Sequence, residues 1–431
     1  MKPIAGALCS VVVFSFAASG LCAADDWRLA KKVGGTLTVY SYGESPYNHG
    51  APFLELEERR VFSNGALAFR QNHSIDATSE DGEGLPIEGD HNARSCEACH
   101  LRDGRGISQT EAFDSTGFSV KTADDGARVP IFRNLLSSSV SHKLQGVEWE
   151  AKQRIELPGG SIVELVAPVA IVDGEKRPAD LRNAPGVYGL GLLEAIPDDE
   201  IRKAAENPEF STFGVRGVVA TACQPDGKSC DKVGRFGWKG TVPSLEAQTR
   251  VALAGELGIY RPASEPTAPA RRSEYERLVT GLAEYLSMLA VPARRIDNPD
   301  EHMRGAQLFE ETGCAMCHRP SWRTSGREDT NKWVRDQQFY PFTDMLLHDM
   351  GEGLADSNHD GRSRFWRTPA LWGIGMQGVV SSEVGYLHDG RARNFLEAIL
   401  WHGGEAAYSV SRFKNLSRED RDRLVAFIAS L

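Results

Sequence analysis

Two copies of one five-residue pattern constrain this chain more than any other feature. Residues 96–100 and 314–318 both read Cys-x-x-Cys-His. At this spacing two thiols join the vinyl groups of one haem and the next histidine binds its iron. A disulfide or half of a zinc site is the alternative for one copy, but no further Cys-x-x-Cys pair exists to complete a four-thiolate zinc site. We therefore interpret the chain as a carrier of two covalently bound c-type haems. The predicted haem-binding residues are Cys96, Cys99, His100, Cys314, Cys317 and His318.

The first 24 residues resemble an export signal. Lys2 provides the positive start, residues 8–16 form an apolar core, and small residues predominate at 18–24. The apolar run is too short to be a comfortable membrane span, although retention as an anchor and a lipid on Cys22 are alternatives. Export suits c-type haem, because the bacterial periplasm is compatible with it and also preserves disulfides. We expect a periplasmic protein with no stable membrane span after signal removal.

Two cysteines remain once the haem thiols and the signal are set aside. Cys223 and Cys230 are separated by six residues in a loop that contains glycine and proline. We favour a local disulfide between them, with two buried free thiols as the alternative.

Hydrophobic periodicity predicts a mainly all-α fold with irregular loops. Helices are expected at residues 54–71, 196–206, 272–289, 299–312 and 418–431. A small β-hairpin is expected over 154–172, with its turn at Pro158-Gly159-Gly160. The net charge of −10 argues against a nucleic-acid partner.

The two halves share more than the haem pattern. The matching stretches, in the same order, are 185–191 with 369–375, 236–240 with 386–390, and 245–247 with 395–398. This order indicates duplication of one haem domain. We expect a first haem domain within 25–292 and a second within 300–431, with a linker at 292–299.

One position breaks the repeat. Counting seven residues from Phe395 reaches His402, whereas counting seven from Leu245 reaches Ala252. If this helix crosses the open face of its own haem, the second iron gains an imidazole and the first keeps a free coordination position. A capped iron moves electrons, and an uncapped iron can bind peroxide.

These motifs make the chain similar to the di-haem cytochrome c peroxidase superfamily, and most closely to its di-haem oxidoreductase (thiol oxidoreductase-like) branch. The resemblance spans roughly residues 92–431 and is carried by 92–95, 102–106, 234–239, 347–351 and 387–392. In the superfamily the position of His402 supplies the distal ligand of the second haem. It is methionine in the bacterial peroxidases and tyrosine in the enzyme that matures methylamine dehydrogenase. Ligation by two histidines implies a lower potential than His/Met ligation.

The resemblance also implies residues around the irons. It places Trp238 between the haems, and Gln248 and Glu256 over the first iron. There a carboxylate can carry a proton from one peroxide oxygen to the other. Core packing is the alternative role of Trp238, and Glu194 competes with Glu256.

Further histidines compete as iron ligands. His348 and Met350 are alternatives to His402 at the second iron. His91 and His142 are candidates to cap the first iron in a resting state, as happens in some peroxidases of the family.

The expected activity is that of a peroxidase. Hydrogen peroxide would react at the first haem, while the second exchanges electrons with a small c-type cytochrome or copper protein. The resemblance implies a calcium ion between the domains, held partly by Glu383 and the carbonyl of Gly385, and a homodimer is compatible with it. One alternative, which His402 favours, is peroxide-dependent oxidation of a protein side chain or organic molecule. The other is a non-catalytic electron carrier with both irons capped.

Overall fold

The computed structural model describes residues 26–72, 93–107, 118–122, 144–172, 174–223, 229–259, 269–357 and 361–431. The expected export signal, His91 and His142 lie outside these residues. Within them, no helix combines the length and the apolar character needed to cross a membrane. The helices are α1 (Leu56–Arg70), α2 (Leu190–Glu194), α3 (Asp198–Ala205), α4 (Pro208–Ser211), α5 (Leu245–Gly255), α6 (Pro269–Met288), α7 (Pro299–Glu311), α8 (Gln377–Val380), α9 (Phe395–Trp401), α10 (Ala407–Lys414) and α11 (Arg418–Ser430).

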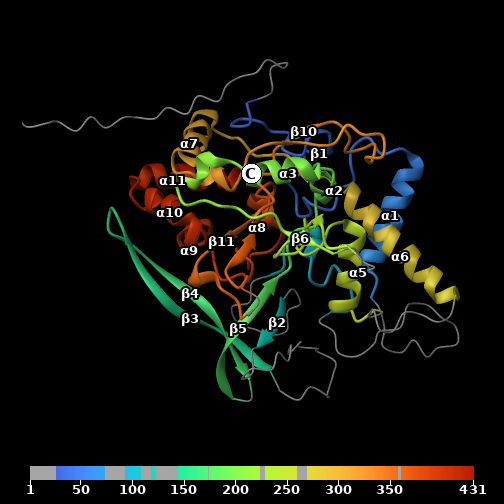
Figure 1. Ribbon diagram of the computed structural model, residues 1–431, viewed down its shortest axis with the longest axis horizontal. Coiled ribbons are helices and arrows are strands. Elements are labelled where there is room, and N and C mark those ends of the chain that lie inside the picture. The colour runs from blue at the N-terminus through green and yellow to red at the C-terminus, as the bar shows by residue number, and fades with distance from the viewer. Residues whose placement is uncertain are drawn as a thin grey trace, which may run out of the picture.

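The helices form a body with two sides. Helices α1, α5 and α6 gather on one side, and α7, α9, α10 and α11 gather on the other (Figure 1). Each side contains one close helix pair, α1 with α6 and α7 with α11. A glycine allows each pair to approach. A Cβ atom on Gly65 would lie 2.5 Å from Cβ of Tyr285, and one on Gly305 would lie 2.5 Å from the carbonyl oxygen of Arg423. Helices α1, α3, α6, α7 and α11 confirm the five helices expected from periodicity.

A four-stranded sheet corrects the expectation of a mainly all-α fold. Helices make up 38% and strands 18% of the structure, so the fold is mixed. The hairpin expected over 154–172 is present but longer, and two further strands extend it. The antiparallel sheet has the order β2-β5-β4-β3 and contains β2 (Phe118–Thr122), β3 (Leu144–Leu157), β4 (Ser161–Val172) and β5 (Glu175–Asn183).

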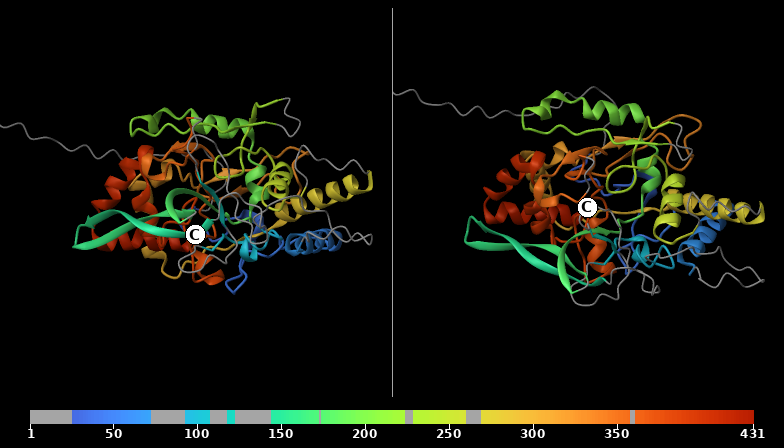
Figure 2. Two further views of the ribbon diagram at one scale, coloured as in Figure 1. Left: turned by 90° about the horizontal axis from the view of Figure 1, so that it is seen from below. Right: turned by 60° about the horizontal axis from the view of Figure 1, so that its bottom comes forward.

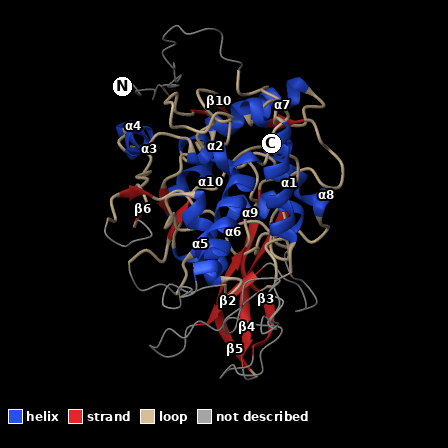
Figure 3. Cartoon of the chain, turned by 90° about the vertical axis from the view of Figure 1, so that its right-hand side faces the viewer, coloured by secondary structure: helices blue, strands red, loops and turns tan. Residues whose placement is uncertain are grey.

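The sheet extends from the helical body (Figure 3). Its β3–β4 edge contacts the second half of the chain. Arg393 on the approach to α9 donates from Nη2 to the carbonyl oxygen of Glu164 at 2.8 Å. Arg421 in α11 donates to that of Pro158 at 2.7 Å. The sheet and α3 lie on opposite sides of the second half (Figure 2).

The other strands form two-stranded pairs. These are β1 (Thr38–Val39) with β8 (Val291–Pro292), β6 (Thr221–Ala222) with β7 (Lys232–Val233), β9 (Trp322–Arg323) with β10 (Gln338–Phe339), and β11 (Leu347–Asp349) with β12 (Phe365–Arg367). The β1–β8 pair brings the beginning of the described chain to residues 291–292, at the edge of the expected linker. Arg294, in that linker, is fully buried. It donates to the carbonyl oxygen of Arg28 at 2.6 Å and to Oγ of Ser430 at 2.8 Å.

The internal repeat is visible in the backbone. Gly189 before α2 and Gly373 before the 3-10 turn η6 (Ile374–Met376) both have positive φ, 71° and 68°. Each is packed by an aromatic residue of the other copy. A Cβ atom on Gly189 would lie 2.6 Å from Trp372, and one on Gly373 would lie 2.7 Å from Tyr188. The two copies therefore face each other reciprocally.

The same reciprocity recurs where the copies cross. The amide of Asn183 donates to the carbonyl oxygen of His388 at 2.7 Å, and the amide of Arg367 donates to that of Trp238 at 3.0 Å. Asn183 and Arg367 are equivalent in the repeat, and so are Trp238 and His388. Two equivalent loops thus meet at the centre of the molecule.

Candidate functional site

The first Cys-x-x-Cys-His motif forms one tight turn. The amides of Cys99 and His100 donate to the carbonyl oxygen of Cys96 at 3.1 and 2.9 Å. The thiols of Cys96 and Cys99 are half-buried and take part in no disulfide. Nδ1 of His100 lies 2.7 Å from the carbonyl oxygen of Pro185. A carbonyl only accepts, so Nδ1 carries the hydrogen and Nε2 is left to bind a metal. Burial lowers the pKa of His100 to about 4, so its imidazole is neutral at pH 7.

The second motif has the same arrangement. The 3-10 turn η4 (Cys314–Met316) places the amide of His318 2.9 Å from the carbonyl oxygen of Cys314, and both cysteines are free and half-buried. Nδ1 of His318 lies 3.0 Å from the carbonyl oxygen of Phe342. Burial, and then the neighbouring His402, lower the pKa of His318 to about 4.

His402 faces His318 across a gap that fits a haem iron. It follows α9, and its Nδ1 lies 2.6 Å from the carbonyl oxygen of Ala398, which leaves Nε2 as the acceptor. Burial lowers its pKa. The two ring centres are 6.5 Å apart. Two metal–nitrogen bonds of about 2 Å each, plus the radius of each ring, span about this distance.

The equivalent helix in the first half carries no such ligand. Helix α5 begins at an N-cap serine, Ser244, whose Oγ accepts from the amide of Ala247 at 3.2 Å. Helix α9 begins at Asn394, whose Oδ1 accepts from the amide of Glu397 at 2.9 Å. The two helices therefore start alike, but α5 has Ala252 where His402 follows α9. No histidine, methionine or cysteine occurs in α5.

Among the buried polar atoms without a partner in the described residues are Oε1 of Gln248 in α5 and Nε1 of Trp401, next to His402. Buried polar atoms are rarely left unpaired, and a bound group with polar edges would satisfy them. The neutral imidazoles and the cysteine pairs outside any disulfide fit one haem at each motif.

The competing ligands of the second iron are less suitable. His348 is buried, with Nε2 at 2.8 Å from Oδ2 of Asp344 and Nδ1 at 2.7 Å from Oε2 of Glu405. Burial would lower its pKa, but Asp344 and the sulfur of Cys317 outweigh this and raise the pKa well above its usual value. A protonated imidazole held by two carboxylates has no nitrogen free for iron. Met350 is half-buried beside this strand.

Trp238 lies where the two copies meet. Its Nε1 donates to the carbonyl oxygen of Asn183 at 2.9 Å, and its ring centre is 6.4 Å from that of His388. His388 also stacks on Trp366, with ring centres 3.6 Å apart. Burial and nearby cations, first Arg182, hold the pKa of His388 well below its usual value. Trp238, His388 and Trp366 therefore form a continuous aromatic row, hereafter the aromatic row, with a neutral imidazole at its centre.

The residues predicted over the first iron share helix α5 and its end. A Cβ atom on Gly237 would lie 3.9 Å from Oε1 of Gln248, so this amide is beside the Trp238 loop. The carbonyl oxygen of Glu256 accepts from the amide of Ala93 at 3.3 Å, three residues before Cys96. Glu194 instead lies at the start of α5, where Oε1 accepts from the amide of Leu245 at 2.7 Å, and burial raises its pKa.

The predicted calcium donors do not fit a calcium ion in this arrangement. The Glu383 side chain is exposed. The carbonyl of Gly385 already accepts from Nη2 of Arg105 at 3.3 Å and from Nδ2 of Asn183 at 3.5 Å. Nη2 of Arg105 also donates to the carbonyl oxygen of Leu387 at 2.7 Å. Calcium needs six to eight oxygen ligands. Here the guanidinium of Arg105 already binds the predicted carbonyl ligand of Gly385.

Sequence reasoning missed the role of Arg105. Its guanidinium carbon lies 5.5 Å from the Trp238 ring centre, so it links the first half to the carbonyls of the second beside the aromatic row. Arg105 lies in the stretch 102–106 that carries the family resemblance, but a sequence motif does not indicate which distant carbonyls a guanidinium binds.

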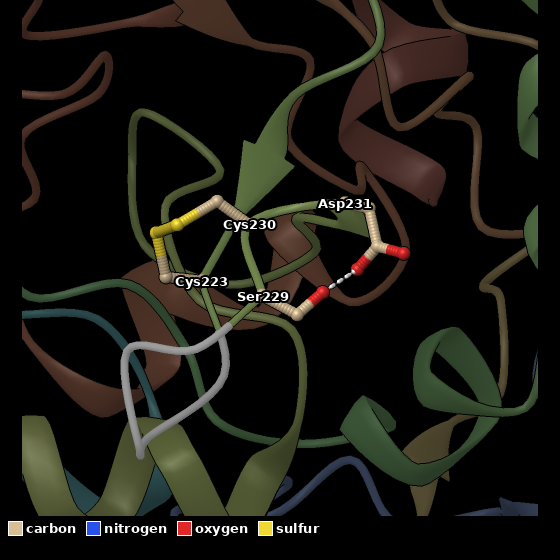
Figure 4. Close-up of a disulfide and its surroundings, with 4 residues drawn as sticks. All are labelled: Cys223, Ser229, Cys230 and Asp231. Carbon is tan, nitrogen blue, oxygen red and sulfur yellow. Dashed lines mark hydrogen bonds between the residues drawn. A yellow bond between two sulfur atoms is a disulfide. The ribbon is translucent and has the colours of Figure 1, made fainter.

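A disulfide joins Cys223 and Cys230. Next to it the hydroxyl of Ser229 donates to the carboxylate of Asp231 (Figure 4). The bridge lies between β6 and β7, and no haem-motif cysteine takes part in it.

Comparison with known proteins adds a family. The family model described as di-haem oxidoreductase, putative peroxidase, matches residues 177–283 and 275–431. Together the two matches cover more than half of the 431 residues and include the second haem motif, while the first precedes them. No curated protein and no solved structure matched.

Proposed function

Because the chain belongs to the di-haem oxidoreductase, putative peroxidase family, we propose that it reduces hydrogen peroxide at the haem bound by His100. In this proposal the haem bound by His318 and His402 receives electrons and passes them inward. The donor is a small c-type cytochrome or copper protein, and the setting is the periplasm, to which the residues of the export signal would direct the chain.

One observation supports the different roles proposed for the two haems. The ring centre of His402 lies 6.5 Å from that of His318. In the first half, the position that matches His402 is Ala252 in α5. The second iron would then be saturated by protein ligands, which suits electron transfer. The first would keep a position for peroxide.

Haem bound at His100 supplies an iron that can hold peroxide and accept its oxidising equivalents. The side chains of the protein would move the proton and orient the peroxide. Glu256 would carry a proton from one peroxide oxygen to the other, so that the O–O bond could break with loss of water. Gln248 would donate from its amide nitrogen to orient the peroxide. With two electrons and two further protons, the overall reaction would convert one hydrogen peroxide into two waters.

The aromatic row gives those electrons a path between the halves. Trp238 contributes from the first half and His388 from the second, and their backbones are tied across the interface. Arg105 beside Trp238 and the cations around His388 disfavour positive charge on the row. A hole in the row is therefore short-lived.

The test is an anaerobic titration of the fully reduced, two-haem protein. We expect carbon monoxide to bind at one haem only, and one equivalent of peroxide to oxidise both haems, because each peroxide takes two electrons. Absence of carbon monoxide binding, with low-spin signals only in the ferric protein, would show that both irons are capped and that the chain is an electron carrier.

The pairing of His318 with His402 also favours a second function. Two imidazole ligands imply a lower potential than a His/Met pair, which suits peroxide-dependent oxidation of a protein side chain or organic molecule. Steady-state turnover with reduced cytochrome or copper protein separates the two. If peroxide oxidises both haems but no such donor restores them, the oxidase function is favoured.

A further inference from the structure

We propose that His348 is a positioning residue for His402. It would hold, through Glu405, the turn that presents His402 to the second haem. This inference rests on the proposed role of His402 as an iron ligand, and it assigns a purpose to a buried charged group that the peroxidase chemistry does not use.

His348 is held at both nitrogens. It lies at the centre of β11, opposite Trp366 in β12, and only 2% of its surface is exposed. Oδ2 of Asp344 lies 2.8 Å from Nε2, and Oε2 of Glu405 lies 2.7 Å from Nδ1. A carboxylate only accepts, so both ring nitrogens donate and the ring carries a positive charge. Each hydrogen bond is therefore charge-assisted.

Glu405 connects this ring to the ligand turn. It lies in the 3-10 turn η7 (Gly404–Ala406), three residues after His402. Its Oε2 also accepts from the amide of Arg216 at 2.8 Å, and its Oε1 accepts from the amide of Asp349 at 3.2 Å. One carboxylate therefore ties η7 to β11 and to the first half.

The backbone next to Glu405 is in close contact with the turn after β11. A Cβ atom on Gly404 would lie 2.1 Å from the carbonyl oxygen of Asp349, and one on Gly351 would lie 2.9 Å from the amide nitrogen of Gly404. Both glycines have positive φ, 52° and 77°. The turn after His402 and the turn after β11 are thus in direct contact, and glycine permits it.

His402 needs this support because of where it lies. It is the C-cap of α9, a helix of seven residues, and helix ends fray when nothing holds them. An imidazole at a frayed end would spend part of its time away from the iron. The ion pair between His348 and Glu405 fixes the turn from its far side, so His402 is already in place when haem is bound.

Removing the cation should loosen the turn. In His348→Gln the carboxylates of Asp344 and Glu405 would face each other without a positive charge between them. In Glu405→Gln the ring loses one charged partner, while the amide oxygen can still accept from a backbone amide. Loss of a buried charged partner is costly, and opening of the turn would relieve it.

The experiment uses the full chain with both haems, and compares six proteins by ferric electron paramagnetic resonance and by carbon monoxide uptake after reduction. They are the wild type, His402→Ala, His348→Gln, Glu405→Gln, the double variant His348→Gln with Glu405→Gln, and the matched control Glu352→Gln. Glu352 lies beyond the same turn and pairs with Arg364 on the surface. Haem content and thermal midpoint are measured for each, so that spectral changes can be separated from failure to fold.

We expect His402→Ala to make the second haem fully high-spin. His348→Gln and Glu405→Gln should raise its high-spin fraction roughly tenfold over wild type at unchanged haem content, and Glu352→Gln should match wild type. In the double variant His348→Gln with Glu405→Gln the opposed charges are reduced, so its high-spin fraction should be lower than in His348→Gln alone.

Two other outcomes would overturn the proposal in distinguishable ways. If only His402→Ala changes the spectrum, the ligand assignment stands and the positioning role of His348 is wrong. If His402→Ala changes nothing while His348→Gln becomes fully high-spin, His348 is the ligand, and the proposed role of His402 fails with it.

Discussion

A single imidazole distinguishes the two iron sites at the residue scale. Helices α5 and α9 begin with the same kind of N-cap, so the duplicated helix is preserved in both halves. In the proposed function, the change from a methyl group at Ala252 to an imidazole at His402 gives the second iron a ligand that the first iron lacks. The two halves would then differ in reactivity although their helices begin alike.

Glu256 is the residue whose role can be tested most directly. Glu256→Gln keeps the size of the side chain but cannot carry a proton, so peroxide cleavage should slow by roughly 10²- to 10⁴-fold. Stopped-flow absorbance of the reduced protein mixed with peroxide measures this rate. Glu194→Gln is the matched control, because the amide oxygen can still accept from Leu245 at the start of α5. Equal rates in Glu256→Gln and wild type, with a slow Glu194→Gln, would transfer the proton role to Glu194.

At the element scale, sequence patterns predicted helices better than strands. Helices such as α7 and α11 bury one face, and that periodicity is visible in the sequence. Much of β3 faces solvent: residues 151–154 are exposed, while Ile155 and Leu157 are buried. Its stability comes from pairing with β4 and from ion pairs such as Lys176 with Glu148 at 2.8 Å. The partners of a strand cannot be predicted from the pattern of that strand alone. The sequence therefore predicted only a hairpin where the structure has four strands.

The close helix pairs give a prediction at this scale. Gly305→Ala would place its methyl group against the backbone of Arg423 in α11, so we expect a loss of about 1–3 kcal/mol of unfolding free energy. Gly281→Ala in α6 is the control, because a Cβ atom there meets nothing within 4 Å. The better helix former should stabilise that helix by about 1 kcal/mol. Urea unfolding followed by circular dichroism measures both. If Gly305→Ala leaves the free energy of unfolding unchanged, α7 and α11 can move apart without a loss of stability.

At the scale of the whole molecule, the duplicated halves interlock at the aromatic row. The sequence repeat showed that Trp238 and His388 are equivalent, and the family resemblance predicted Trp238 between the haems. It could not show that the equivalent loops cross, because the crossing bonds run between main-chain atoms. The roles of Arg105 and Glu405 were likewise invisible, since each depends on which carbonyl or imidazole a distant segment brings near.

Arg105 leads to a prediction about metal removal. Because its guanidinium already binds the carbonyls of Gly385 and Leu387, a calcium chelator should leave both haem spectra and the peroxide titration unchanged. Arg105→Ala would remove the guanidinium from the carbonyl oxygen of Leu387 at a cost of about 1–3 kcal/mol, while the carbonyl oxygen of Gly385 would keep Nδ2 of Asn183 as a donor. Dialysis against chelator followed by the anaerobic titration provides the test. Loss of peroxide reactivity that added calcium restores would show that an ion, and not Arg105 alone, bridges the halves.

The first described residues of the chain close over its final helix. Trp27 packs edge-on against Phe342 and Phe427, and Arg28 pairs with Glu310 at 2.8 Å. Chains are synthesised from the N-terminus, so Trp27 cannot pack against Phe427 until α11 has been synthesised. Phe342, whose carbonyl oxygen lies 3.0 Å from Nδ1 of His318, is therefore covered late. Both Cys-x-x-Cys-His motifs are complete before this cover closes.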